Sequence, residues 1–392
     1  MPLFLERVLT GREPGVPSAR PPAPTTPRLH FLDGLRGIAL ILMVINHTAR
    51  WWMDVSMGWG RYYLAYASMT LPAPLFLFLV GFCLPISFRR QGERPAFFAA
   101  IPRYLRRGVE LVLANMLLNL LVFPEDPVWT GGVLQTIGLS IRIVAPLMWV
   151  AHHRWVQYGV LALAVALYVS FAWAVPVLIE WAPRHRLISD VLFRDFPPWP
   201  WIAAALIGLV FGWWWLDARQ RGDAPEARYF KAAALAGVGC ILAVFIWDWW
   251  METSPRVSFK RDFLLNHHWT PRGVTNLWIA GGVADLLALT YWVMEVKKRT
   301  FGWLVVLGQT AFMLYFLHQL IVLTLVKKAL GTQFNDWLLY VAMNLLLTIV
   351  LVYLGKAWLD IKRRVRLGPA HLVRRFASAR RSAAGHGPGR SR

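Results

Sequence analysis

Two polar pairs interrupt the first long apolar stretch of the chain, RLHFLDGLRGIALILMVINHTARWW. Asp33 and Arg36 lie at its start, and Asn46 and His47 lie near its end. Arg36 offers a planar fork of donors that suits a phosphate, and the imidazole of His47 titrates near neutrality and can act as a general base. On a helix these two residues would be about 16 Å apart. An interfacial ion pair and a hydrogen-bonded structural histidine are the alternative roles.

Further polar side chains lie deep inside later apolar stretches. They are Arg142, Asp285, His318 and Gln135. Ionisable groups are costly inside a membrane, so we treat them as candidate functional residues. Arg142 and Asp285 have opposite charges and could form a buried structural pair. Alternatively, together with His318 they could line the path of a transporter or flippase for a sugar or a lipid.

The composition indicates an all-α integral membrane protein. The chain has 392 residues, of which 57% are hydrophobic and only 16% are charged, whereas a soluble protein has about 25% charged residues. A bilayer core about 30 Å thick needs about 20 apolar residues per helix. The sequence therefore predicts a bundle of about ten transmembrane helices, at roughly 35–52, 66–88, 106–123, 131–150, 155–179, 199–216, 230–250, 274–296, 301–326 and 337–359.

The distribution of Lys and Arg predicts that both termini lie in the cytosol. With the N-terminus inside, the cytosolic segments hold about thirty of these residues and the outer segments about eleven, as the positive-inside rule requires. The net charge of +21 resides in short loops and tails, which favours anionic lipid over nucleic acid as a partner. We divide the chain into a disordered cytosolic leader (1–27), a transmembrane domain (28–360) and a basic cytosolic tail (361–392).

The outer face carries two long segments, 180–198 and 251–273. Simple connectors would be shorter, and long loops frequently carry function. His267, His268 and Trp269 in the second segment are therefore candidates for contact with a substrate outside the membrane.

Motifs for several other chemistries are absent from the sequence. It has no Walker A loop, no GxSxG elbow, no HExxH pair and no dinucleotide-binding fingerprint. Cys83 and Cys240 each lie in an apolar stretch, which predicts small buried side chains and no disulfide or metal site. A catalytic role would therefore need a donor that already carries an activated group.

Six segments resemble known membrane acyltransferases. The first-helix signature of that superfamily, L-D-x-x-R-G followed about eleven residues later by histidine, resembles LDGLRGIALILMVINH. Five later segments resemble the heparan-α-glucosaminide N-acetyltransferase group and its bacterial relatives: TLPAPLFLFLVGFCLPISFRR, GGVLQTIGLS, FPPWPWIAAALIGLVFGWW, HHWTPRGVTNLWIAGG and LGQTAFMLYFLHQLIV. The six matches follow the family order over about residues 28–325.

This resemblance implies transfer of an acyl group, usually acetyl, from cytosolic acetyl-CoA to a sugar or glycan acceptor on the other side of the membrane. It implies His47 as the catalytic histidine, with Asn46 orienting the imidazole or holding the oxyanion. Arg36 and Asp33 match the opening motif. We expect Arg36 near the donor phosphates, with further candidates on the cytosolic side: Arg103, Arg106 and Arg107. The resemblance is also compatible with a location in a bacterial plasma membrane and with a homo-oligomer.

The sequence also departs from the family pattern. In the eukaryotic branch the working histidine follows the first helix, whereas this chain has no histidine between His47 and His152. Either His47 takes that role, or another residue does, or the chain is inactive. Besides the transporter, a noncatalytic membrane scaffold is a third hypothesis.

Overall fold

The structure is a computed structural model that describes residues 28–67, 70–90, 94–193, 196–250 and 274–384. Every secondary-structure element of the described residues is a helix, so the predicted all-α fold class is confirmed for them. The longer helices are α2 (His30–Trp52), α4 (Pro72–Arg90), α5 (Arg94–Val122), α6 (Val133–Leu147), α7 (Arg154–Trp181), α9 (Pro198–Gln220), α10 (Asp223–Trp250), α12 (Val274–Tyr291), α13 (Gly302–Gln319) and α14 (Trp337–Ala384). Short elements include α3 (Trp59–Tyr62), η2 (Tyr63–Ala67), α8 (Arg186–Leu192) and η6 (Leu320–Ala329).

Eight helical stretches among the described residues are long and apolar enough to cross a bilayer, so this is a multi-pass membrane protein. All ten predicted spans fall on helices, but α5 and α6 are not among the eight. Helix α6 has only 15 residues, and α5 carries Arg103, Arg106 and Arg107 in its first half. The count of ten and the cytosolic position of both termini stay predictions.

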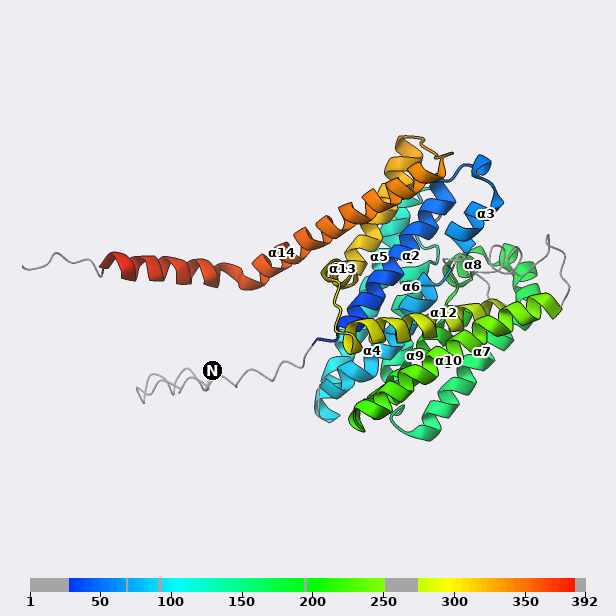
Figure 1. The fold of residues 1–392 in the computed structure, drawn as a ribbon, viewed down its shortest axis with the longest axis horizontal. Helices are drawn as coiled ribbons and strands as arrows, with labels where there is room; N and C mark the ends of the chain where they lie inside the picture. The colour runs from blue at the N-terminus through cyan, green and yellow to red at the C-terminus, as the bar shows by residue number, and fades with distance from the viewer. Residues whose placement is uncertain (1–27, 68–69, 91–93, 194–195, 251–273, 385–392) are drawn as a thin grey trace, which may run out of the picture.

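Glycines set the closest helix contacts in the bundle. A side-chain carbon at Gly308 of α13 would collide with the carbonyl of Asp33 on α2, and one at Gly208 of α9 would collide with the carbonyl of Phe78 on α4. Only glycine lets the backbones approach this closely. Because α2 and α13 run in the same direction, the contact near their starts also brings their later residues together (Figure 1).

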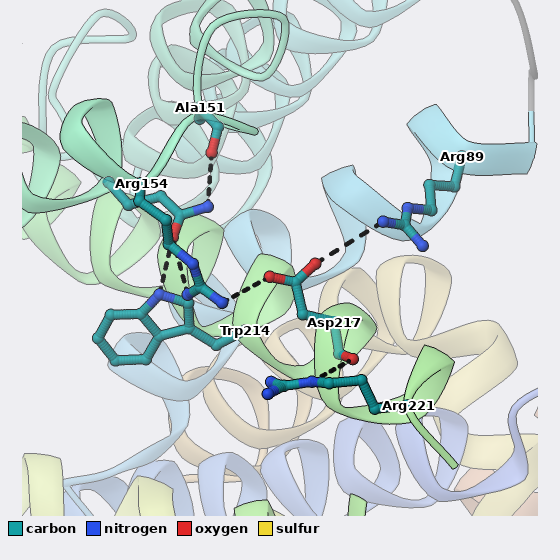
Figure 2. A network of polar contacts seen from close by, with 7 residues as sticks. Arg89, Ala151, Arg154, Trp214, Asp217 and Arg221 are labelled. Atoms are coloured by element: carbon teal, nitrogen blue, oxygen red, sulfur yellow. Dashed lines mark hydrogen bonds and ion pairs between the residues drawn. The ribbon is translucent and has the colours of Figure 1, made fainter. Parts of the chain in front are cut away.

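A polar network ties three helices together at one end of the bundle (Figure 2). The carboxylate of Asp217 on α9 accepts a hydrogen bond from Arg154 on α7 at 2.7 Å and lies 3.7 Å from Arg89 on α4. Gln157 on α7 accepts a hydrogen bond from the indole of Trp214 at 2.8 Å. Both arginines belong to segments predicted to be cytosolic, and the network shows that these segments lie at the same end of the bundle; which compartment that end faces stays a prediction.

The last helix, α14, leads away from the bundle at its C-terminal end (Figure 1). The predicted boundary between domain and tail, at 360/361, lies inside this helix. The predicted leader, 1–27, lies outside the described residues.

Candidate active site

Two histidines from distant parts of the chain face each other in the bundle. Nδ1 of His47 on α2 lies 2.8 Å from Nε2 of His318 on α13, and the two ring planes are nearly parallel, at 2°. His318 is fully buried, whereas His47 is half-buried. The sequence singled out both residues but did not predict that they meet, because 271 residues separate them.

A backbone carbonyl decides which nitrogen of each ring carries hydrogen. Nδ1 of His318 lies 3.0 Å from the carbonyl oxygen of Leu314, which can only accept, so we assign the hydrogen to that nitrogen. Neutral His318 then presents the lone pair of Nε2, and His47 donates its Nδ1–H to it. This leaves Nε2 of His47 with a lone pair, the form that a general base requires.

Gln319 supports the same assignment. Its side-chain amide lies 3.0 Å from Nδ1 of His47, and its oxygen as placed is buried without a hydrogen bond. The two ends of an amide look alike and are assigned from their partners. We turn the amide so that the oxygen accepts from Nδ1–H of His47. A second acceptor then holds the ring in the same tautomer.

The neighbours of His47 fix the backbone of α2 at this level. The amide of Asn46 donates to the carbonyl of Tyr66 at 2.9 Å. On the other side, the hydroxyl of Thr48 lies 2.7 Å from the side-chain oxygen of Asn344 on α14. Asn46 is thus hydrogen-bonded to the η2 segment, and no hydrogen bond to His47 supports its predicted role in orienting the imidazole. It lines the inner chamber, and its other predicted role, holding the oxyanion, stays a prediction.

His47 lies where two cavities meet. The outer cavity has a volume of about 330 Å³ and extends past Arg50 and Asn119 to Glu125 and Asp126. The inner chamber has about 40 Å³ and is lined mostly by apolar side chains. The residues that line both are His47, Val133, Phe196 and Tyr315. A group in the inner chamber and a group in the outer cavity can therefore both reach His47.

Two residues that line these cavities have a buried hydroxyl group without a hydrogen-bond partner. Thr130 lines the outer cavity and Thr70 lines the inner chamber, and the hydroxyl of each is buried and makes no hydrogen bond. Buried polar groups normally have a partner. Water or a polar ligand in the cavities would supply it.

Side-chain amides build part of the wall of the outer cavity. Asn115 and Asn119 donate to the carbonyl of Thr130 at 3.0 and 2.7 Å. Gln135 on α6 donates to the carbonyl of Val191 in the last turn of α8. Asn115 and Asn119 thus hold the irregular chain between α5 and α6 in place, and Gln135 joins α6 to α8, so all three have a positioning role.

A second polar site lies at the start of α2. The buried carboxylate of Asp33 pairs with Arg28 at 2.6 Å and with Arg36 at 3.2 Å. Arg36 also donates to the sulfur of Cys83 at 3.1 Å. These residues and Ser87 line a cavity of about 380 Å³. Two guanidinium groups beside one carboxylate leave a net positive charge for an anionic ligand. Cys83, predicted to be a plain buried side chain, is half-buried and part of this site.

The other predicted arginines lie elsewhere. Arg103, Arg106 and Arg107 are exposed on α5 and do not line the cavity of Arg36. Arg106 and Arg107 pair with Glu110 at 3.3 and 3.1 Å. The structure therefore does not bring them together with Arg36, which corrects the grouping made from the sequence.

The predicted pair of Arg142 and Asp285 does not form among the described residues. Arg142 is exposed on α6 beside Gly108 of α5, and Asp285 on α12 lies against Gly237 of α10. The reason is that α6 packs on α5 and α9 whereas α12 packs on α10. His267, His268 and Trp269 lie outside the described residues.

A known protein family matches the first part of the chain. The family model described as heparan-alpha-glucosaminide N-acetyltransferase, catalytic, matches residues 28–247, more than half of the chain. Among proteins with curated descriptions, none matches. The matched range contains the Asp33–His47 segment and the walls of the outer cavity up to Phe196, while His318 lies beyond it.

Proposed function

The chain belongs to the heparan-α-glucosaminide N-acetyltransferase family, and from this premise we propose that it transfers acetyl from cytosolic acetyl-CoA to a sugar or glycan on the outer side of the membrane. The family makes the chain a membrane acyltransferase; the donor, the acceptor and the site residues are our proposal. The observation that carries it is the position of His47. Its Nδ1 lies 2.8 Å from Nε2 of His318, and His47 lines both cavities.

The reaction follows from the assigned tautomer. The hydroxyl or amine of the acceptor attacks the carbonyl carbon of the thioester while Nε2 of His47 takes its proton. The bond from carbon to sulfur breaks, and the thiolate of CoA receives the proton from His47. During the step His47 is cationic, and its Nδ1–H bond to His318 becomes charge-assisted and stronger.

A covalent route uses the same atoms. Nε2 of His47 would attack the thioester itself, and the resulting acetyl-histidine would pass the acetyl group to the acceptor. In that case one equivalent of free CoA appears before acceptor is added. A burst of CoA release in the absence of acceptor distinguishes this route from direct transfer.

The donor would bind with its phosphates at the positive site of Arg28 and Arg36. Along α2 this site is about 16 Å from His47. Coenzyme A carries its phosphates and its thiol at opposite ends of a long flexible arm, which suits two sites separated in this way. The acetyl group itself would occupy the inner chamber.

The acceptor would enter the outer cavity. Trp51 and Phe123 offer aromatic surfaces for a sugar ring. A hydroxyl or amine of the acceptor placed beside His47 completes the arrangement.

The test is transfer of labelled acetyl from acetyl-CoA to a panel of amino sugars and glycans by the purified full chain. We expect transfer by the wild type and loss of at least a hundredfold in His47→Ala. Unchanged transfer in this variant would remove His47 from the reaction. If no acceptor is labelled and the chain binds no CoA thioester, the proposed function is wrong.

The transporter hypothesis has no support from the geometry. It needs Arg142, Asp285 and His318 on one path, but they lie on α6, α12 and α13 without a shared cavity among those that border His47. His318 is fully buried and has a hydrogen-bonding role beside His47.

A further inference from the structure

A large apolar cavity lies next to the inner chamber. It has a volume of about 370 Å³ and lies between α4, α7, α9, α10 and α12. Small side chains leave this space open, among them Ala204, Ala233 and Ala284. The proposed reaction with acetyl does not use it.

The cavity and the inner chamber share a wall. Pro74 of α4 lines both. On α9, Trp201 lines the chamber and Ala204 lines the cavity, and these residues are one helical turn apart. The two spaces therefore follow one another along the seam between α4 and α9.

The two spaces differ in size in a way that matters for the donor. The chamber, at about 40 Å³, holds about three water-sized groups, which is the size of an acetyl group. The cavity, at about 370 Å³, is in the range of ligand sites. It is apolar and lies at the depth of the membrane-spanning helices, so a hydrocarbon chain suits it better than water does.

We infer that the cavity receives the hydrocarbon chain of an acyl group longer than acetyl, so that the enzyme also accepts medium-chain acyl-CoA donors. The inference rests on the proposed function. The first carbons of the acyl group occupy the chamber beside His47, and the chain continues past Pro74 toward Phe78 and Ala204. The bonds that break and form are those of acetyl transfer: the acyl carbon leaves sulfur for the acceptor atom, and the proton passes by way of His47 to the CoA thiolate.

The experiment compares acetyl-, butyryl-, hexanoyl- and octanoyl-CoA with one acceptor, using the full chain in lipid nanodiscs. The readouts are kcat/KM and competition against labelled acetyl-CoA. Each buried methylene raises affinity about fourfold, so we expect octanoyl-CoA to bind at least tenfold more tightly than acetyl-CoA. Equal or falling affinity with chain length would overturn the inference.

Two variants test whether the hydrocarbon chain of the donor lies in the apolar cavity. Ala284→Phe fills the cavity and is expected to lower the octanoyl-to-acetyl ratio of kcat/KM at least tenfold. Ala232→Phe places the same side chain on the exposed face of α10, away from the cavity, and is the matched control with the wild-type ratio. Ala204→Leu, a smaller change on α9, replaces Ala284→Phe if that variant does not fold.

The outcomes separate this inference from the proposed function. Acetyl transfer without any preference for longer chains, or equal ratios in Ala284→Phe and Ala232→Phe, overturns the inference alone and indicates that a bilayer lipid fills the cavity. Absence of transfer and of binding for every donor overturns the proposed function and the inference with it.

Discussion

At His47 the direction of one hydrogen bond decides which nitrogen is available for chemistry. The carbonyl of Leu314 fixes the hydrogen of His318, and His318 in turn fixes the hydrogen of His47. His318, a buried imidazole that accepts from His47 and donates to Leu314, is thus a positioning group, comparable to the partner that orients the histidine in a catalytic triad. It does not touch the reacting atoms.

This role predicts a graded series at position 318. His318→Leu removes the acceptor, and we expect kcat to fall at least tenfold with little change in KM for acetyl-CoA. His318→Gln keeps an oxygen that can accept from Nδ1–H of His47, so it is expected to restore part of the activity. The measurement is steady-state kinetics, with the pH profile of kcat/KM as a second readout. His153→Ala, in an exposed turn, is the control. An equal loss of kcat in His318→Leu and His318→Gln would contradict the positioning role of His318.

Arg36 gives a second prediction at this scale. Arg36 lines the cavity at the start of α2, whereas Arg106 on α5 pairs with Glu110 of its own helix. Arg36→Ala is expected to raise KM for acetyl-CoA about tenfold or more, because a charge-assisted contact with phosphate contributes more than a neutral hydrogen bond. Arg106→Ala should change KM less than twofold. A larger rise of KM in Arg106→Ala than in Arg36→Ala would place the donor phosphates at α5.

The sequence could predict part of the site. Asp33, Arg36 and His47 were identified because polar groups are rare in membrane helices, and each lies in a polar site or cavity of the structure. The pairing of His47 with His318 could not be predicted, since it depends on how α13 packs on α2. Arg28 was counted only as a basic residue, because its pairing with Asp33 depends on the chain path just before α2.

At the scale of elements, the approach of α13 to α2 decides whether the two histidines meet. The contact at Gly308 leaves no room for a side chain, whereas Gly302 at the start of the same helix faces open space. The segment after Gln319 changes to the wider η6, and such changes in helix type are frequent at functional sites. Trp52 then donates to the carbonyl of Val322 at 2.9 Å and fastens η6 to α2.

Gly308→Val is therefore expected to separate the helices. Forcing extra carbons into a close contact costs about 1–3 kcal/mol, so the melting temperature in detergent should fall. Transfer activity should fall as well, because His318 moves away from His47. Gly302→Val is the matched control and should leave both properties near those of the wild type. Normal activity in Gly308→Val would show that the reaction does not need the pair.

The positions of the helices follow from apolar length, but their partners do not. Each of the ten predicted spans falls on a helix because hydrocarbon requires about twenty apolar residues with internal hydrogen bonds. The prediction could not recognise the shortness of α6, whose helix ends at Leu147. Nor could it exclude a contact between Arg142 and Asp285, since opposite charge says nothing of which helices adjoin.

At the scale of the whole molecule, the two polar sites lie at opposite ends of α2. Arg89, Arg154 and Asp217 form their network at one of these ends (Figure 2). The Arg36 cavity is at the same end, since Arg36 contacts Cys83 on α4, the helix that carries Arg89. The outer cavity opens at the other end, beside Arg50 and Glu125. Transfer across the membrane requires that these ends face different compartments, so topology and mechanism are linked.

Reporter fusions test this link. A fluorescent protein that matures only in the cytosol is expected to fluoresce when fused to the C-terminus, because the excess of Lys and Arg places that end inside. Alkaline phosphatase, which is active only outside, is expected to be active when fused at Glu125, between α5 and α6. The reverse result would place the Arg36 cavity outside, where no acyl-CoA is available. The site of His47 could then remain catalytic only with a donor other than a cytosolic CoA thioester.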